Sequence, residues 1–366
     1  KKEEITYIFF QTTPHMAFDF LMFYIAKYFK IKTYIFFRTY YENSILVSDD
    51  YRINKFKPII NKDPFLKSGN DFKSLNPSIW YNLGKKINSN SKKKNNINNF
   101  FFYFFLILKK IKYAYYNKQI NSFHCFNGKI NIFYFIYLHV KHLAKTYLLK
   151  RQYSKFTNEL NISGLKYVFF AMHNQPEKTT NPEGEDFKDN FLAINFLREI
   201  LPDDILLLVK EHPKQLNFFS GDVRQLNFRN LNLYSQINSL RNTQLTPINW
   251  NSDHLIQNSI LNSTITGTVA WESVLKKKPA ISFGNTWHSK CDSTPIISRN
   301  KKIAQQQVND LINKSSTEIE NDIKKFLDSS SDLVFNTTIS NFEINESNYD
   351  HKILSNNMKK LINQIL

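Results

Sequence analysis

The stretch KYVFFAMHNQPEKTTNPEGEDFKDNFLAINFLREILPDDILLLVKEHP, residues 166–213, carries the strongest fold signal in the chain. Residues 166–172 form an apolar, largely aromatic run that predicts a buried strand, and residues 205–209 form a second one. Between them, residues 186–201 place apolar side chains every three or four positions, which predicts a helix. A strand, a helix and a strand in that order favour parallel strands joined by a helical crossover, and therefore an α/β domain.

The same alternation continues downstream of this stretch. Residues 263–265 and 279–283 predict two more strands, with a helix at 269–276 between them. The tail from Asn313 predicts a helix, a polar turn and a last amphipathic helix at 353–366. The second half of the chain is therefore expected to hold most of a parallel sheet.

A second strand–helix–strand unit opens the chain. Residues 5–10 and 33–37 predict strands, and residues 16–29 predict the helix between them. The basic stretch 85–94 is typical of a solvated loop, with a specific anion or membrane contact as the alternative. Residues 100–149 alternate apolar runs with lysine pairs, which favours amphipathic helices that pack on the core.

A chain of 366 residues is longer than a single core usually supports, so two domains are expected. We predict an α/β protein of two Rossmann-like domains whose parallel sheets face a cleft. The first domain spans 1–160 and includes the basic, partly helical insertion, and the second spans 161–345. Residues 346–366 are expected to form a C-terminal helix that packs back on the first domain.

The formal net charge of +18 favours anionic partners: nucleotide sugars, phosphorylated lipids, acidic glycans, a membrane surface or nucleic acid. Two cysteines, Cys125 and Cys291, do not form a disulfide framework, so a reducing compartment is expected. We find no cleavable leader, and the apolar runs fall short of the roughly 20 residues that span a bilayer. The expected location is the cytoplasm, with a peripheral contact at the inner face of the cell membrane.

Four polar clusters follow predicted strands of the second half. They are residues 173–177, 210–213, 266–268 and 284–287, and each is marked by proline or glycine. The carboxyl ends of parallel strands share one edge of a sheet, where ligands bind. We therefore expect all four clusters to contribute to one ligand site.

The cluster Thr266, Gly267 and Thr268 leads into a helix, whose first N–H groups can bind a phosphate, although an ordinary threonine N-cap gives the same pattern. Glu272 lies one turn further on, where it reaches a ribose or sugar hydroxyl or is simply a surface glutamate. His212 is held in extended geometry by Pro213 and can donate to a phosphate, or it is a structural histidine. The donor-binding residues that we predict are Lys210, His212, Pro213, Thr266, Gly267, Thr268, Glu272, Gly284, Asn285 and Trp287.

Acid and base candidates lie in the same loops. Glu211 can act on a hydroxyl, and His173 and Glu177 flank Pro176, where they serve as acid or base or merely cap a turn. In the first half, His15 and Asp19 are four residues apart at the start of a helix, on the expected acceptor side of the cleft. The catalytic candidates are Glu211, His173, Glu177, Asp19 and His15. The chain lacks GxGxxG, GxxxxGK[ST], HExxH and GxSxG, which leaves the commonest dinucleotide, P-loop, zincin and hydrolase signatures without support.

The segments 167–180, 208–213, 265–272 and 278–287 together resemble the capsule polysaccharide biosynthesis family, which includes the bacterial β-Kdo transferases. The resemblance covers about residues 165–295, and the first 160 residues add only a compatible fold. It implies a GT-B architecture and a glycosyltransferase that moves a sugar from a nucleotide-sugar donor to a glycan or glycolipid. For the Kdo transferases it implies a CMP-activated acid sugar as donor.

By the same resemblance, His212 contacts the donor phosphate, residues 266–268 form its helix-end cradle, and Glu272 holds part of the nucleotide or sugar. No metal or other cofactor is expected, because basic side chains and helix ends stabilise the leaving phosphate in GT-B enzymes. The acidic-glycine-aromatic segment that carries a catalytic acid in the Kdo transferases has no counterpart here. The catalytic nucleophile or base, and retention or inversion, therefore stay open.

Two alternatives fit the same sequence. A UDP-sugar transferase or a sugar-nucleotide epimerase of GT-B-like fold predicts binding of UDP rather than CMP. A basic protein that binds nucleic acid or an anionic membrane predicts salt-sensitive binding that survives mutation of His212. The strand-end clusters argue against the second alternative, and no nucleic-acid partner is expected.

Overall fold

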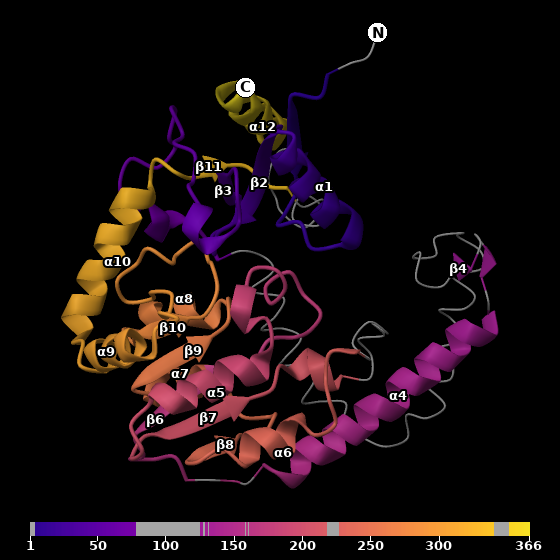
Figure 1. The fold of residues 1–366 in the computed structure, drawn as a ribbon. Helices are drawn as coiled ribbons and strands as arrows, with labels where there is room; N and C mark the ends of the chain where they lie inside the picture. Colours follow the sequence, from indigo (N-terminus) through magenta and orange to yellow (C-terminus); the bar gives the residue numbers. More distant parts are fainter. Residues whose placement is uncertain are drawn as a thin grey trace.

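The computed structural model describes residues 4–77, 125–126, 129–130, 132–157, 159, 161–217, 227–339 and 351–366. Two sheets organise this part of the chain (Figure 1). The basic stretch 85–94 and the predicted helical region up to residue 124 lie outside the described residues.

The second half of the chain forms a five-stranded parallel sheet, which confirms the predicted α/β class. Its strands in spatial order are β10 (Ala280–Ser282), β9 (Leu261–Thr264), β6 (Tyr167–Ala171), β7 (Leu206–Lys210) and β8 (Thr243–Leu245). All four pairings are parallel. Numbered by position along the chain, the order is 3-2-1-4-5 when read from β8, as in Rossmann-type sheets.

Helices cover both faces of this sheet because successive strand residues point to opposite sides. Val168 and Phe170 face the larger apolar cluster, and Tyr167 and Phe169 face the smaller one. The larger cluster includes residues of α5 (Asn190–Ile200), α6 (Leu233–Asn238) and α9 (Lys301–Ile312). The smaller one includes residues of α7 (Ser252–Asn258), and α8 (Val269–Leu275) follows β9.

The first sheet is mixed, which corrects the prediction of two wholly parallel sheets. Its order is β1 (Tyr7–Phe10), β2 (Lys32–Arg38), β3 (Ser44–Ser48) and β11 (Phe335–Asn336). β1 and β2 are parallel, whereas β3 is antiparallel to β2 and to β11. Residues 39–43 are too few for a crossover and form a hairpin turn instead, with Asn43 at φ 47°.

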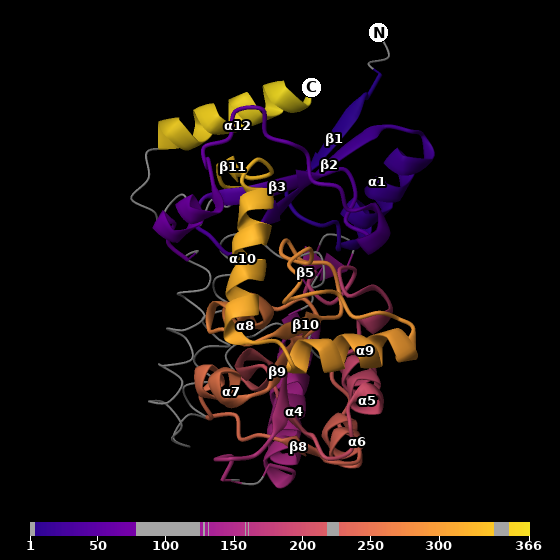
Figure 2. The ribbon, with the colours of Figure 1, turned by 90° about the vertical axis from the view of Figure 1, so that its left-hand side faces the viewer.

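Two helices enclose the first sheet. Phe23 and Ala26 are the buried residues of α1 (Ala17–Tyr28), and Phe23 packs in one apolar cluster with Ile35 of β2. Tyr34 of β2 faces the opposite side, where Leu361 of α12 (His351–Ile365) is buried. Figure 2 shows α12 lying across this sheet.

Helix α10 (Ser316–Ser330) carries the chain from the second sheet back to the first (Figure 2). Phe326 of α10 and Trp271 of α8 pack in the same apolar cluster as the first-sheet residue Phe37. The Gly69 N–H in η2 (Gly69–Ser74) donates to Asp328 Oδ1 over 2.7 Å. The two halves therefore share a core, and the last elements of the chain belong structurally to the first sheet.

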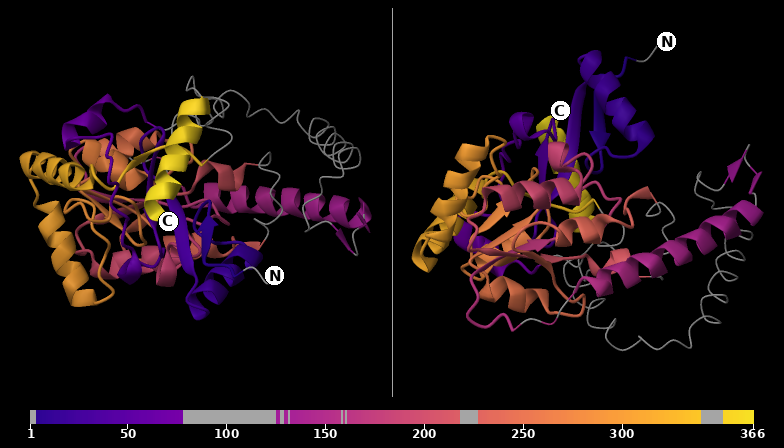
Figure 3. Two further views of the ribbon diagram at one scale, coloured as in Figure 1. Left: turned by 90° about the horizontal axis from the view of Figure 1, so that it is seen from above. Right: turned by 60° about the horizontal axis from the view of Figure 1, so that its bottom comes forward.

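Helix α4 (Ile132–Lys155) follows the short hairpin of β4 (Cys125–Phe126) and β5 (Lys129–Ile130). Figure 3 shows its C-terminal end at the second domain and its first turns extending away from it. The remaining elements are the short helices η1 (Ile53–Lys55), η4 (Glu185–Phe187) and η5 (Pro213–Leu216). Within the described ranges, no helix combines the length and the hydropathy needed to cross a bilayer.

Candidate functional site

The strand order of the second sheet reverses between β6 and β9. β7 and β8 lie on one side of β6, and β9 and β10 lie on the other. In such sheets the loops that leave the two central strands open a crevice at the carboxyl edge, which is where ligands bind. The loop after β6 contains His173 and the loop after β9 contains Thr266, so two of the predicted clusters meet at this reversal.

His173 connects these two loops. Its Nε2 accepts a hydrogen bond from the Thr266 backbone N–H over 3.0 Å and lies 3.0 Å from Thr264 Oγ1. Burial, and then the positive charge of Arg229, lower the pKa of His173 to about 3, so the ring is neutral at pH 7. Because Nε2 accepts from an N–H group, the single ring proton lies on Nδ1, which is left to donate to a ligand.

Gly267 is packed tightly beside this histidine. A Cβ at position 267 would lie 2.7 Å from Thr264 Oγ1 and 3.3 Å from His173 Nε2. Among the described residues, none accepts a hydrogen bond from the backbone N–H groups of Gly267, Thr268 or Val269. These donors are free for a ligand anion, although α8 has only seven residues and adds little dipole of its own.

The side chains of Thr266, Thr268 and Glu272 already form hydrogen bonds within the protein. The Thr266 hydroxyl donates to the Thr179 carbonyl over 2.5 Å, which joins the loops after β9 and β6. The Thr268 hydroxyl donates to Glu272 Oε1 over 2.6 Å and makes no N-cap hydrogen bond. The threonine N-cap alternative therefore does not describe this loop.

His212 lies at the start of η5, where its Nδ1 accepts the Lys214 N–H over 3.2 Å. Burial, followed by the nearby positive groups, lowers the pKa of His212 to about 3, so its remaining proton lies on Nε2. Pro213 occupies the first turn of η5, where no N–H is needed. Lys210 donates from Nζ to Ser252 Oγ of α7 over 2.9 Å.

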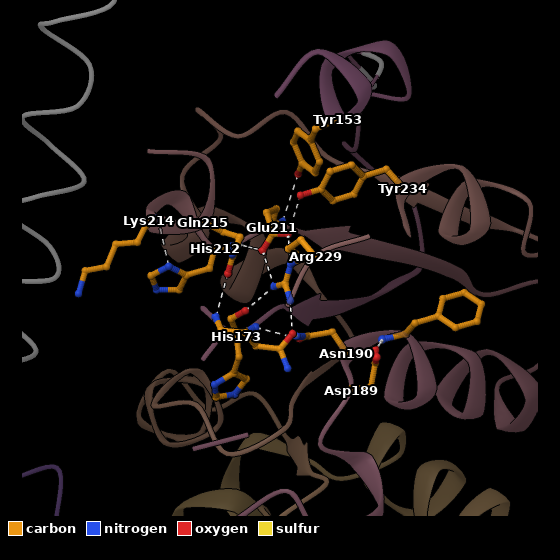
Figure 4. A network of polar contacts seen from close by, with 12 residues as sticks. Tyr153, His173, Asp189, Asn190, Glu211, His212, Lys214, Gln215, Arg229 and Tyr234 are labelled. Atoms are coloured by element: carbon orange, nitrogen blue, oxygen red, sulfur yellow. Dashed lines mark hydrogen bonds and ion pairs between the residues drawn. The ribbon is translucent and has the colours of Figure 1, made fainter. Parts of the chain in front are cut away.

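Glu211 is not available as a general base, which corrects that prediction. It is 1 % exposed, and its carboxylate accepts from the Arg229 guanidinium, from the Tyr234 hydroxyl over 2.8 Å and from the His212 N–H over 2.7 Å (Figure 4). The Tyr153 hydroxyl accepts the Glu211 N–H over 3.1 Å. Every oxygen of the carboxylate is thus engaged within the core.

Arg229 is a site residue that sequence reasoning missed. Burial alone would lower its pKa, but the charge and hydrogen bonds of Glu211 raise it above its usual value. Its guanidinium also donates to the carbonyl of His173 and to Oε1 of Gln175, which in addition accepts from Asn190 Nδ2 over 3.0 Å. Figure 4 shows Arg229 between the Glu211 carboxylate and the loop of His173, whose ring points away from this network. A single arginine in a loop gives no sequence signal for such a role.

In the loop after β6, Glu177 and Glu183 differ in exposure. Glu177 is exposed, and its carboxylate accepts from Asn174 Nδ2 over 3.1 Å and from Thr179 Oγ1 over 3.3 Å. Glu183, which sequence reasoning missed, is 6 % exposed. It accepts from Lys178 Nζ over 2.9 Å and from Thr13 Oγ1 over 2.5 Å. Thr13 belongs to the first domain, so Glu183 joins the two halves beside the site.

His15 and Asp19 lie at the carboxyl end of β1 and the start of α1. The Asp19 carboxylate accepts the His15 N–H over 3.3 Å. His15 Nδ1 lies 2.9 Å from the Thr13 carbonyl, which can only accept, so Nδ1 is the donor. Thr13 therefore contacts both His15 and Glu183, and the predicted acceptor-side pair is connected to the loop after β6.

Asn285 of the cluster at 284–287 contacts the first half of the chain, and the assignment of this cluster to the donor stays a prediction. Asn285 Nδ2 donates to the Tyr51 carbonyl over 3.1 Å, and Trp287 packs on Trp271 with ring centroids 4.8 Å apart. A Cβ on Gly284 would clash with the Glu183 carbonyl oxygen, so glycine permits this close approach of two loops.

No group of three or more His, Cys, Asp or Glu side chains placed to hold a metal ion occurs within the described residues. The absence of a metal from the mechanism stays a prediction.

Comparison with known proteins does not place this chain in a family. No family model matches the chain, and no curated protein matches it. Similar solved structures include glycosyltransferases and UDP-GlcNAc 2-epimerases.

Three of these structures illustrate the extent of the similarity. The UDP-GlcNAc 2-epimerase of Methanocaldococcus jannaschii is 18 % identical over 46 % of this chain and 43 % of its own, with a TM-score of 0.31. The β-Kdo 2,7 transferase KpsC of Thermosulfurimonas dismutans is 14 % identical over 51 % of this chain and 61 % of its own, with a TM-score of 0.27. A glycotransferase of kitacinnamycin is 12 % identical over 48 % and 44 %, with a TM-score of 0.28. This chain therefore covers less than two thirds of each, and the similarity assigns neither a family nor an activity.

Proposed function

We propose that this protein is a glycosyltransferase that binds a nucleotide-sugar donor at the reversal point between β6 and β9. The observation that carries the proposal is the position of His173, a neutral buried histidine whose Nε2 is held by Thr266. Its Nδ1–H and the free N–H groups of residues 267–269 supply several donors at one point of the sheet edge.

Such donors can stabilise the phosphate of a nucleotide sugar, which gains negative charge when its bond to the sugar breaks. Hydrogen bonds that are already oriented toward the developing charge stabilise a transition state without reorganisation. Two nearby cations already have anionic partners, because Arg229 binds Glu211 and Lys178 binds Glu183. Lys214 follows His212 by two residues, and Figure 4 shows its side chain pointing away from the buried network. In this proposal Lys214 supplies the positive charge and His173 and His212 supply neutral donors.

The acceptor enters from the side of the first domain in this proposal. His15 donates from Nδ1 to Thr13, which leaves Nε2 as the ring atom that can take a proton from an acceptor hydroxyl. Asp19 holds the backbone of His15 and so positions it. The base is thereby assigned to His15, in place of Glu211.

For the donor we propose a CMP-linked acid sugar, and for the acceptor a glycan or lipid-linked glycan of a capsule or other surface polysaccharide. The support is the resemblance of segments 167–180, 208–213, 265–272 and 278–287 to capsule polysaccharide enzymes. The UDP-sugar transferase and the epimerase remain the alternatives at the same site.

Calorimetric titration of the protein with CMP, UDP and GDP tests the donor site. We expect saturable binding of CMP that His173→Ala weakens at least about tenfold, since a hydrogen bond to a charged group contributes on the order of 1.5–3 kcal/mol. Gly267→Ala should weaken it too, because the new methyl group would approach Thr264 Oγ1. His254→Ala, an exposed histidine on α7, is the matched control and should bind as the wild type does.

The outcomes separate the alternatives. Preference for UDP would replace the CMP donor by a UDP-sugar donor, and turnover of UDP-GlcNAc without an acceptor would indicate an epimerase. Nucleotide binding that survives both His173→Ala and Gly267→Ala would refute the assignment of the site.

A further inference from the structure

Helix α4 has two different faces. One is buried against the protein and consists of residues spaced by three or four: His139, His142, Thr146, Leu149 and Tyr153. The opposite face carries large apolar side chains that remain in contact with solvent: Phe133, Ile136, Tyr137, Val140, Tyr147 and Leu148. Phe133 is 82 % exposed, and Tyr137 and Val140 are each 54 % exposed.

The exposed residues lie on one side of the helix, in an apolar stripe. Positions 133, 136, 137, 140, 147 and 148 repeat at the three- and four-residue spacing that places side chains on a single side of a helix. Figures 1 and 3 show the first turns of α4 extending away from the second domain, so the stripe continues beyond the body of the protein. The other end is anchored, because the Tyr153 hydroxyl donates to the Thr246 carbonyl over 2.6 Å.

Basic side chains border this stripe. Lys141, Arg151 and Lys155 project next to it, and Lys141 lies over the ring of Tyr137, with Nζ 5.6 Å from the centroid. Burial and the charge of Lys141 together lower the pKa of Lys145, which reflects how closely the positive groups are set. The sequence from Phe72 to Asn158 holds sixteen lysines and arginines and no aspartate or glutamate, so most of the net charge of +18 belongs to it.

We propose that the exposed face of α4 docks on an anionic phospholipid membrane, with the helix axis in the plane of the interface. Phenylalanine and tyrosine insert at the headgroup level, while lysine and arginine stems extend along the apolar stripe and place their charges among lipid phosphates. Each basic residue near an anionic surface adds to the attraction. No membrane crossing is involved, since α4 lacks the apolar length for it.

A nucleic acid fits this face less well than a lipid surface. Its phosphates would be attracted to Lys141, Arg151 and Lys155, but backbone binding gives Phe133 and Val140 no apolar environment to enter. The membrane accounts for both the charge and the apolar stripe. The proposal does not depend on the donor site, because the exposed stripe lies on the side of α4 opposite Tyr153 and its contact with Glu211.

Co-sedimentation of the full chain with vesicles tests the proposal. Vesicles of phosphatidylcholine alone are compared with vesicles of phosphatidylcholine mixed with phosphatidylglycerol, at low and high salt. We expect binding only to the anionic vesicles, with weaker binding at high salt. The triple variant Phe133→Ser, Tyr137→Ser, Val140→Ser should bind at least about tenfold more weakly, as should Lys141→Gln, Arg151→Gln, Lys155→Gln.

The matched control removes an exposed apolar set from another helix. Phe18, Leu21 and Tyr28 of α1 are 77 %, 57 % and 82 % exposed, so Phe18→Ser, Leu21→Ser, Tyr28→Ser deletes comparable surface. This control should keep vesicle binding, and all variants should keep the wild-type thermal transition and nucleotide binding. The proposal is overturned if the wild type does not bind anionic vesicles, or if the α1 variant loses as much binding as the α4 variant. It is also overturned if the full chain binds RNA but not anionic vesicles.

Discussion

Arg229 lies where three segments of the second domain meet. It binds the carboxylate of Glu211 at the end of β7, the carbonyl of His173 after β6, and the side chain of Gln175. A buried charge is tolerated only when it is paired and hydrogen-bonded. The Glu211–Arg229 pair therefore holds the loops after β6 and β7 in one arrangement. It fixes the positions of His173 and His212, which lie in these loops.

Replacing Arg229 tests this role. Arg229→Met leaves Glu211 as an uncompensated buried charge, and we expect the free energy of unfolding to fall by about 3–5 kcal/mol. Adding Glu211→Gln removes the orphan charge and should recover part of that loss. Urea unfolding followed by circular dichroism measures both.

The control for this experiment is Arg241→Met. Arg241 pairs with Asp203 at the surface, where its side chain is 57 % exposed, so its loss should cost less than about 1 kcal/mol. Equal effects at Arg229 and Arg241 would contradict the assigned role.

At the scale of elements, the strands and helices with long apolar periods were predictable. The predictions at 166–172, 205–209 and 269–276 correspond to β6, β7 and α8, each within two residues of its observed ends. Among the strands that were missed are β3, β8 and β11, of five, three and two residues. For β11 the partner is distant in sequence, because it pairs with β3 across almost 300 residues.

The sequence could predict which loops form the site, but not which of their side chains are already bound within the protein. Where a strand ends is a local property, so the polar loops after β6 and β9 could be named from the sequence. Whether a side chain in such a loop is already occupied depends on residues elsewhere in the chain. Glu211 is saturated by Arg229 and Tyr234, and Asn285 binds Tyr51 of the first domain, none of which adjoins it in sequence.

Helix α12 makes a testable contribution to the first sheet. Leu361 is 1 % exposed and packs with Tyr34, Phe36 and Val47. Leu361→Ala should lower the free energy of unfolding by about 2–4 kcal/mol, because it removes buried methyl groups and leaves a cavity. Ile353→Ala, at a position 52 % exposed on the same helix, should change it by less than about 0.5 kcal/mol. Denaturant titration measures both variants. If Leu361→Ala left the free energy of unfolding unchanged, α12 would not contribute to the stability of the first sheet.

At the scale of the whole molecule, the two halves contact each other through polar loops as well as through a shared core. Thr13 binds Glu183, the Ile53 N–H binds Glu185 over 2.9 Å, and Asn285 binds the Tyr51 carbonyl. All three contacts involve the loops after β6 and β10, next to the candidate site. A change in the relative position of the halves would therefore alter the loop that carries His173.

Acid stability is the whole-molecule property for which the structure makes the clearest prediction. His173, His212 and His288 each have a pKa lowered to about 3, chiefly by burial. In the unfolded chain these side chains titrate near pH 6.5, so between about pH 6.5 and pH 3 the unfolded state binds protons that the native state does not. The free energy of unfolding should therefore fall as the pH is lowered through this window.

Each such histidine contributes a slope of up to about 1.4 kcal/mol per pH unit once the pH is well below 6.5. Urea unfolding at about pH 7, 6 and 5 measures how the free energy of unfolding changes with pH. These values lie above the range in which the titration of carboxylates dominates that change. His288→Gln removes one of the three groups and should make the dependence on pH shallower, whereas the exposed His254→Gln should leave it unchanged. An equally steep dependence in His288→Gln would mean that the fold does not hold His288 neutral.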